Sequence, residues 1–452
     1  MRYEEYISTP EAVWFDSIPA SWRATKMRAV FLERNEKVSD KDFAPLSVGK
    51  MGVVPQLETA VKTDNGDNRK LIRKGDFAIN SRSDRKGAGG ISVYDGSASL
   101  IITVLKPHHE LNGRFYHYLL RNHYFSEEFY RNGHGLVSDL WTTKWDEMRN
   151  IYIPVPSREE QEQIVRYLDW QTSRINRLIH GIQREINLLE ERRGWLINRS
   201  VTQGIQSKVP LKDSGIRWIG KIPIHWNVLA LKKCASLRSG ITLGKQYPRG
   251  THLIEVLYLR VANVQNGFVD TSDIATISVT TEEREKYALS PGEVLMTEGG
   301  DRDKLGRGCV WNGSISPCIH QNHVYAISTD PLLLNNFYLE YLTVSNVARE
   351  YFDLTATKTT NLASTNSTKV LSFPIPVPPI EEQIAIVSYL KKTCEQYDSV
   401  ISKLQIQIAY LKEYRTRLIS DVVTGQMDVR SIEIPEYTPE DDTAENGDDP
   451  AE

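Results

Sequence analysis

The sequence has few cysteines and no Cys-x-x-Cys pair. Its 452 residues include only Cys234, Cys309, Cys318 and Cys394. So few thiols exclude a disulfide-stapled secreted domain and indicate a reducing compartment, which we expect to be the cytoplasm. Two of these cysteines lie near His320 and His323, but at spacings that are not usual for zinc, so we expect no metal site.

Long apolar runs and a secretory leader are also missing. No stretch is apolar enough over about 20 residues to cross a bilayer, and no basic-then-apolar segment follows Met1. Hydrophobic residues make up 40% of the chain and charged residues 25%, which is typical of a soluble protein. The length of 452 residues is enough for two or three domains with cores of their own.

The signatures of common catalytic sites are absent as well. The sequence has no Gly-x-x-x-x-Gly-Lys-[Ser/Thr] phosphate loop, no Gly-x-Ser-x-Gly, no His-Glu-x-x-His and no glycine fingerprint after a strand. Asp301-Arg302-Asp303-Lys304 faintly resembles the carboxylate set of a metal-dependent nuclease, but it is one acidic loop without a matching strand. We therefore expect no catalytic residues and no cofactor in this chain.

The net charge is small, at −3, but it is unevenly distributed. Residues 431–452 carry nine acidic side chains and no Lys or Arg, which leaves +6 on the rest of the chain. A mildly basic body is compatible with a nucleic-acid partner. The acidic tail has the composition of a disordered segment, and a purely solvating role is its simplest interpretation.

The main positive feature is a long internal repeat. Ile153-Pro154-Val155-Pro156 recurs as Ile375-Pro376-Val377-Pro378, at a shift of 222 residues that holds without a gap as far as Leu196 and Leu418. Alternating prolines enforce extended backbone in each copy, and Glu-Glu-Gln then opens a helical run. Ser157 precedes the first of these runs at capping-box spacing.

The repeat extends beyond these junctions. The motif from Trp14 to Trp22 recurs from Trp218 to Trp226, at a shift of 204 residues. The order along the chain is therefore globular segment, helix, globular segment, helix.

Each helical run of about 45 residues carries an apolar column with a seven-residue period. The column consists of Leu168, Ile175, Ile182, Leu189 and Leu196 in the first run, and of Leu390, Tyr397, Leu404, Leu411 and Leu418 in the second. The second seam column is less regular, with Ile164, Gln171, Leu178 and Glu185 in the first run. Such heptads favour two long paired helices over separate core helices, and pairing within one chain or between chains fits the pattern equally.

Inside each globular segment, short strands flank a charged, glycine-rich loop. Residues 81–90 form this loop in the first segment and residues 298–308 in the second. Arg and Lys on such loops reach phosphates, and Arg can fork onto guanine. A solvated turn is the alternative for either loop alone, but two loops at corresponding places in a repeat favour binding. Polar stretches at 141–144 and 355–361 are weaker candidates of the same kind.

These motifs together resemble the specificity subunit of type I restriction–modification enzymes. The resemblance rests on the Trp218 to Trp226 motif, the twin Pro-x-Pro-x-Glu-Glu-Gln junctions and the long helix after each, and it covers nearly all of 1–430. The first Trp motif departs from the pattern, with Phe15-Asp16-Ser17 in place of Ile219-Gly220-Lys221. The resemblance implies an α+β fold, in which two similar α/β target-recognition domains are separated by two long helices. These helices would form an intramolecular antiparallel coiled coil with pseudo-two-fold symmetry.

The resemblance also implies where the domains begin and end and which partners the chain binds. The expected parts are target-recognition domain 1 (1–156), the first spacer helix (157–204), target-recognition domain 2 (205–378), the second spacer helix (379–425) and an acidic disordered tail (426–452). Expected partners are double-stranded DNA, two modification (methyltransferase) subunits and restriction (motor-nuclease) subunits. S-adenosylmethionine, ATP and Mg would be held on those partner subunits.

The charged loops and polar stretches supply the expected DNA-binding residues. They are Arg82, Asp84, Arg85, Lys86, Lys144, Asp301, Arg302, Lys304, Arg307 and Lys358. The hypothesis is a non-catalytic subunit that reads a bipartite DNA target. Two alternatives are a nuclease or methyltransferase with its own site in one repeat, and a scaffold without DNA contact.

Overall fold

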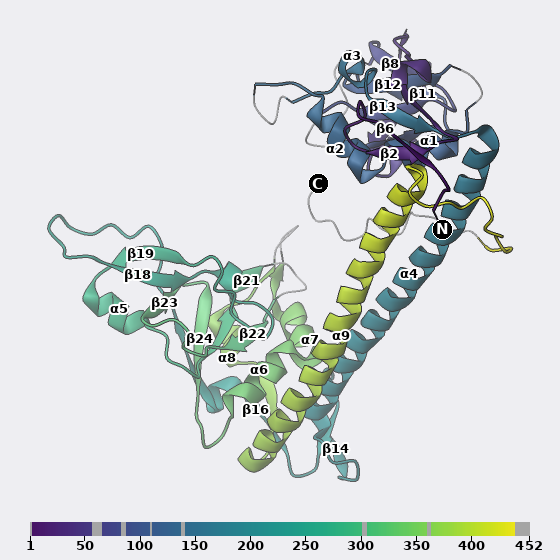
Figure 1. The fold of residues 1–452 in the computed structure, drawn as a ribbon. Coiled ribbons are helices and arrows are strands. Elements are labelled where there is room, and N and C mark those ends of the chain that lie inside the picture. Colours follow the sequence, from purple (N-terminus) through teal and green to yellow (C-terminus); the bar gives the residue numbers. More distant parts are fainter. Residues whose placement is uncertain are drawn as a thin grey trace. The chain divides into compact units, whose positions relative to one another are not determined.

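The protein is described by a computed structural model that covers residues 2–56, 66–82, 87–108, 111–136, 141–300, 305–358 and 363–438. The chain forms two compact units (Figure 1). Unit 1 comprises Met1–Gln183 and Leu404–Glu452, and unit 2 comprises Arg184–Lys403. The two long helices are α4 (Arg158–Gln203) and α9 (Ile380–Val423). Each of them is divided between the two units, with one part in unit 1 and the other in unit 2.

The globular part of unit 1 is a set of short strands with three short helices. The strands are β1 (Tyr6–Ser8), β2 (Ser17–Pro19), β3 (Arg23–Lys26), β4 (Phe31–Glu33), β5 (Lys37–Val38), β6 (Leu46–Gly49), β7 (Gly52–Pro55), β8 (Arg69–Ile72), β9 (Phe77–Asn80), β10 (Gly89–Ile91), β11 (Gly96–Ala98), β12 (Ile102–Pro107) and β13 (Tyr152–Val155). The helices are α1 (Gly113–Leu120), α2 (His123–Arg131) and α3 (Trp145–Met148).

Unit 2 repeats this plan with additional strands. Its strands are β14 (Leu211–Asp213), β15 (Lys221–Pro223), β16 (Asn227–Ala230), β17 (Ala235–Ser239), β18 (Ile254–Leu259), β19 (Ala275–Val279), β20 (Val294–Thr297), β21 (Gly299–Gly300), β22 (Gly308–Val310), β23 (Cys318–His320), β24 (Val324–Thr329), β25 (Thr357–Lys358), β26 (Ala363–Ser364) and β27 (Pro374–Val377). The helices are α5 (Thr281–Tyr287), α6 (Asn336–Val344), α7 (Asn346–Thr355) and α8 (Ser367–Leu371).

Both units are built around the same four-stranded antiparallel sheet. Its order is β10-β9-β12-β4 in unit 1 and β22-β20-β24-β17 in unit 2. The proline-rich junction strands pair in the same way, β13 with β3 and β27 with β16. The expected fold class, α+β with two similar mixed domains and two long paired helices, is confirmed.

Two segments with amphipathic spacing in the sequence, Phe115 to Phe129 and Phe337 to Phe352, are each folded as two helices. Asn122 ends the first segment's α1 and caps α2, because its side chain accepts a hydrogen bond from the Tyr124 N–H at 2.8 Å. Ser345 separates α6 from α7 in extended backbone. Local capping therefore interrupts a helix that the continuous apolar pattern alone would extend.

The Glu-Glu-Gln of each junction ties the start of a long helix to its own unit. The Glu160 carboxylate accepts a hydrogen bond from Tyr3 Oη at 2.5 Å, and the matching Glu382 accepts one from Trp226 Nε1 at 3.0 Å. Gln161 and Gln383 donate to the carbonyls of Pro156 and Pro378. The expected capping box at Ser157 is half formed, because Glu160 turns to Tyr3 instead of back to the helix start. The duplicated Glu-Glu-Gln motif therefore fixes the start of each long helix to the globular part of its own unit.

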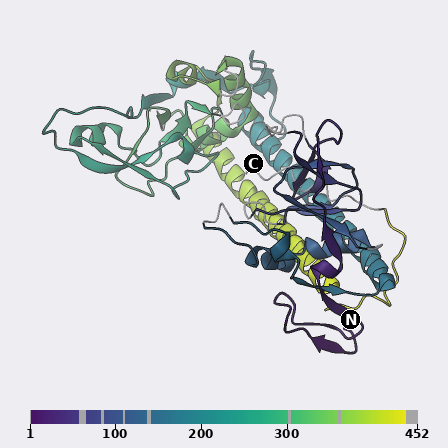
Figure 2. The ribbon, with the colours of Figure 1, turned by 90° about the horizontal axis from the view of Figure 1, so that it is seen from above.

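α4 and α9 lie side by side in both views (Figure 1 and Figure 2). Their direction follows from the cores, because the start of α4 and the end of α9 share the core of unit 1. The end of α4 and the start of α9 share the core of unit 2. Within each unit the two helices are therefore antiparallel.

The heptad column lies in the contact between the helices. Leu168, Ile175, Leu390 and Leu418 are buried, and the other six residues of the column are partly buried. From Leu178 on, the second column continues at Ile179 and Ile186, the positions to which the apolar stripe of the sequence drifts. Leu178 and Glu185 are exposed, whereas Ile179 and Ile186 are buried, because a helix with 3.6 residues per turn drifts against a seven-residue repeat.

Two polar pairs occupy matched places between the helices. In unit 1, Arg415 of α9 donates to Asn176 Oδ1 of α4 at 2.7 Å. In unit 2, Arg193 of α4 forms an ion pair with Asp398 of α9. Because Arg193 matches Arg415 and Asn176 matches Asp398 at the shift of 222, one pair is the repeat image of the other. Asn176 is buried, so its bond to Arg415 disfavours other registers. The Arg193–Asp398 pair is more exposed, at 35% and 55%, and it falls in the same alignment of α4 with α9.

The expectation of a disordered tail from residue 426 is wrong for residues 426–438. This segment, which we name the C-terminal strap, returns along α4. Gln163 Nε2 donates to the carbonyls of Val429 and Ile432 at 2.9 and 2.8 Å, and Arg177 donates to the Thr438 carbonyl at 2.8 Å. Val429 is fully buried, so apolar contact holds the strap despite its acidic continuation. Residues 439–452 lie outside the described residues.

Gly204 and Gly425 end the two long helices with positive φ, at +75° and +76°. We expect Gly425→Ala to lower the free energy of unfolding of unit 1 by about 2–4 kcal/mol. A left-handed alanine costs about 1–2 kcal/mol, and the new Cβ would overlap the fixed ring of Pro19, with Cγ at 2.7 Å. Urea unfolding followed by a signal from each unit measures the change.

Gly204→Ala is the matched control for that substitution. Its Cβ would meet Glu382 Oε1 at 3.1 Å and Trp226 Cζ2 at 3.3 Å, which are tight contacts but not the overlap found at Pro19. We expect it to cost less than Gly425→Ala, about 1–2 kcal/mol, because the backbone cost is the same and the steric clash is smaller. Equal losses for the two variants would show that Pro19 is not the cause.

Candidate nucleic-acid interface

In unit 1 the charged loop and the polar stretch before the junction are neighbours. Arg82, where the loop begins, forms an antiparallel bridge with Thr142. The Thr143 N–H donates to the Ser81 carbonyl at 2.9 Å, and Thr142 also bridges to His134. Two segments about 60 residues apart in the sequence are thus held together by backbone hydrogen bonds.

A buried residue anchors the polar stretch to the core of unit 1, while the basic side chains of the loop and the stretch are exposed. Thr143 is 1% exposed and donates from Oγ1 to the Phe129 carbonyl at 2.9 Å. Arg82 and Lys144 are both exposed. The Lys144 N–H donates to Glu147 at the start of α3, which fixes the backbone there and leaves the ammonium group to reach outward.

Unit 2 brings the corresponding segments together as a small sheet. β21 follows Glu298 at the start of the charged loop, pairs with β26, and β26 pairs with β25. The Thr365 N–H donates to the Glu298 carbonyl at 2.8 Å. Lys358 on β25 is exposed and forms an ion pair with Asp353 at 3.0 Å. The described part of the second polar stretch, residues 355–358, therefore lies beside the start of the charged loop.

The other residues expected to bind DNA fall into two groups. Arg307 is described and partly buried, one residue before β22. Those that lie outside the described residues are Asp84, Arg85, Lys86, Asp301, Arg302 and Lys304.

Sequence reasoning missed one polar cluster beside the unit 2 loop. Glu298 accepts a hydrogen bond from Tyr325 Oη at 2.7 Å and another from His323 Nδ1. Burial and the bond to Glu298 raise the pKa of Tyr325, which keeps its hydroxyl as the donor. His323 and Tyr325 lie 25 and 27 positions after Glu298, so no local motif marks the cluster.

The Cys–His cluster noted in the sequence is part of the core of unit 2. Cys309, Cys318 and His320 are all buried. Burial raises the pKa of Cys309 to about 12 and that of Cys318 to about 11, and it lowers the pKa of His320 to about 4. Within the part of the chain that the structure describes, no three His, Cys, Asp or Glu side chains gather as metal ligands.

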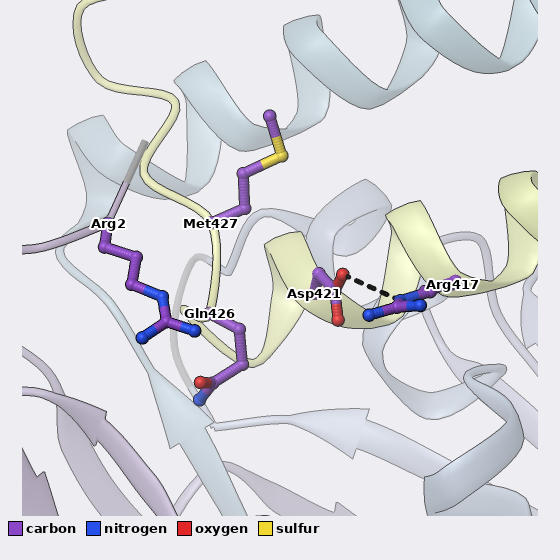
Figure 3. Close-up of a pocket in the computed structure, with 5 residues that line it drawn as sticks. All are labelled: Arg2, Arg417, Asp421, Gln426 and Met427. Carbon is purple, nitrogen blue, oxygen red and sulfur yellow. Dashed lines mark ion pairs between the residues drawn. The ribbon is translucent and has the colours of Figure 1, made fainter.

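One cavity of about 530 Å³ lies in unit 1, away from the residues expected to bind DNA. It is lined by Arg2, Arg417, Asp421, Gln426 and Met427 (Figure 3). Figure 3 shows Arg417 paired with Asp421, at 3.6 Å, and Arg2 on the other side of Gln426. The cavity is open and polar, and it holds no nucleophile or acid–base pair. No described helix is both long and apolar enough to cross a membrane.

Comparison with known proteins gives a consistent result. Residues 30–188 match the family model of the type I restriction modification DNA specificity domain. The chain is similar to the type I restriction enzyme MjaVIII specificity subunit of Methanocaldococcus jannaschii, with 25% identity over 63% of this chain and 64% of the relative. It is also similar to the putative MjaX specificity subunit of the same organism, with 24% identity over 46% of this chain and 47% of the relative. These alignments span about half to two thirds of the relatives' lengths.

A solved structure shares the fold. It comes from work on complex assembly and conformational transition of the type I R-M system, and it superposes with a TM-score of 0.60. The superposition covers 91% of this chain and 99% of the other, at 15% sequence identity. The solved structure confirms the fold that the sequence motifs implied, and the family model matches residues 30–188 of the chain.

Proposed function

Because the chain carries a type I restriction–modification DNA specificity domain, we propose that it is the DNA sequence-recognition subunit of such a system. Each unit reads one half of a bipartite target in double-stranded DNA. The observation that carries this proposal is the matched pair of interfaces. In both units, the charged loop and the polar stretch are joined by backbone hydrogen bonds, and exposed cations stand on that frame.

The two long helices act as the spacer between the readers. A helix of 46 residues is about 69 Å long, and one turn of DNA rises about 34 Å. A rod of this length is sufficient to hold two readers over successive major grooves. The polar pairs Asn176–Arg415 and Arg193–Asp398 support this role because they disfavour slippage of one helix along the other.

The chain itself does no chemistry in this proposal. Methyl transfer to adenine and DNA cleavage are carried out by modification and restriction subunits, which hold S-adenosylmethionine, ATP and Mg. A cytoplasmic location goes with this role because the DNA of the host lies there. The purified chain with DNA and Mg²⁺ should leave the DNA intact.

Exposed apolar residues on the long helices support docking of two copies of one partner. Tyr410 of α9 is 67% exposed in unit 1, and the matching Leu188 of α4 is 65% exposed in unit 2. Leu178 and its match Val400 are 56% and 43% exposed. Large apolar side chains on a helix surface mark contact sites when they cluster. Their recurrence at the shift of 222 fits two equivalent sites, one for each modification subunit.

Replacing Tyr410 by Ser should weaken one of these two sites. An aromatic anchor in an interface contributes about 2 kcal/mol or more, so we expect roughly 30-fold weaker binding of one modification subunit and a shift from two bound copies towards one. Analytical ultracentrifugation with the purified modification subunit measures the stoichiometry.

Lys412→Ala is the control for Tyr410→Ser. Lys412 is exposed on the same helix but two residues away, so it points to the other side of α9. It should leave both sites intact. Unchanged binding by the Tyr410 variant would remove this face of α9 from the proposed partner contact.

The decisive test of the proposal is a map of methylated adenines in cells that carry this chain with its modification subunits. A bipartite motif with a fixed gap is expected, and it should vanish when this chain is omitted. Methylation without a motif, or a motif unaffected by the omission, would contradict the proposal.

A further inference from the structure

The base of the charged loop has the same backbone in both units but different side chains. In unit 2 the Glu298 N–H, directly after β20, donates to the His323 carbonyl, directly before β24, at 2.9 Å. In unit 1 the Ser81 N–H, directly after β9, donates to the Ile101 carbonyl, directly before β12, at 3.2 Å. A carboxylate and an imidazole thus stand in unit 2 where unit 1 has a hydroxyl and an alkyl group.

The side-chain contacts at this place orient the imidazole of His323. Its Nδ1 bonds to the Glu298 carboxylate, which can only accept, so Nδ1 carries the proton. Tyr325 Oη donates to the other oxygen of the same carboxylate at 2.7 Å and holds it in place. In the neutral ring Nε2 is then an acceptor, and no described residue bonds to it.

The imidazole stands at the edge of the unit 2 interface. Glu298 leads directly into β21, and its carbonyl accepts from the Thr365 N–H next to β26. β26 in turn pairs with β25, which carries the exposed Lys358. The side chain of His323 is 54% exposed. An exposed, oriented acceptor is therefore joined through this small sheet to the strand that carries Lys358, a cation that suits the phosphate backbone.

Resting on the proposed function, we propose that His323 reads a base in the half-site of unit 2 and that Glu298 positions it. Nε2 would accept a hydrogen bond from an exocyclic amino group in the major groove, either N6 of adenine or N4 of cytosine. In unit 1, Ser81 is buried and its hydroxyl donates to the Ile101 carbonyl at 2.6 Å, and Ile101 has no polar side-chain atom, so the two units read different bases at this place. Tyr325 holds the carboxylate and does not touch DNA.

The test compares three variants in the enzyme assembled with its modification subunits. Methylated adenines are mapped across the genome for His323→Ala, Glu298→Gln and Tyr325→Phe, and thermal unfolding of each chain is recorded. His323→Ala should relax one position of one half-site about fivefold or more, because a single base contact is lost. The other half-site and the gap should stay as in the unaltered chain.

Glu298→Gln gives a readout that a purely structural cluster would not give. A glutamine amide can donate to Nδ1, which moves the ring proton to Nε2 and turns the reading acceptor into a donor. The preferred base at that one position should then shift towards guanine, whose O6 and N7 accept. Tyr325→Phe should keep the base preference.

The results that would overturn this proposal differ from those that would overturn the proposed function. If all three variants keep the full motif, or if His323→Ala and Tyr325→Phe reduce methylation equally at every position, the cluster is only a clamp and the proposal is overturned. If the proposed function itself were wrong, the methylation map of the unaltered chain would contain no bipartite motif.

Discussion

A chain in which Arg82, Arg85 and Lys86 are replaced by alanine should lose one half of its DNA target and keep the other. These residues share one charged loop of unit 1, although only Arg82 is within the described residues. Each base contact contributes about 1–3 kcal/mol, so loss of two or more should weaken recognition of that half-site by roughly a hundredfold or more. Methylation of DNA substrates with one altered half-site measures which half is still read.

The matched variant in unit 2 replaces Arg302, Lys304 and Lys358 by alanine. It should affect the opposite half-site, because these residues stand on the corresponding loop and strand. Both variants should also show a shallower dependence of affinity on salt, since each lost phosphate contact reduces the slope by about 0.9. Equal loss at both half-sites in either variant would contradict a division of reading between the units.

Lengthening both long helices by one heptad should widen the gap between the half-sites. Seven residues are inserted after Glu185 in α4 and after Gln405 in α9, which are opposite positions in the register that the two polar pairs define. Seven residues add about 10.5 Å to each helix, or about three base pairs of DNA. Mapping of methylated adenines reads the new gap directly.

The control inserts the same seven residues in α4 alone. The heptad phase is kept, but the residues beyond the insertion no longer face their partners in α9, so assembly and methylation should fall. A doubly extended chain that methylates with the original gap would show that the helices do not set it.

The repeat made much of the fold predictable. Proline fixes extended backbone before each long helix, and Gly204 and Gly425 suit a left-handed residue after it, so bounds of 157–204 and 379–425 differ little from Arg158–Gln203 and Ile380–Val423. These are local effects of single residue types. They act wherever the residue occurs, and a duplicated motif doubles the signal.

The features that were missed depend on contacts between distant residues. Composition alone marked 426–452 as a tail, but the buried Val429 and the amide of Gln163 hold its first part on α4. The Glu298–His323–Tyr325 cluster is likewise assembled by strand pairing. No pattern of spacing within one element reports such contacts. The charged loops and the polar stretches could therefore be nominated from the sequence, whereas the strap contacts and the Glu298–His323–Tyr325 cluster could not.

The polar pairs between the long helices have a consequence for ancestry. Arg193 faces a residue whose repeat image is Asn176, and Arg415 faces Asn176 itself. The alignment is thus self-complementary: a half-length chain with only the first helix would find, in a second copy of itself, an asparagine opposite each Arg193. Duplication of such a half-length chain accounts for both the repeat at a shift of 222 residues and the matched polar pairs.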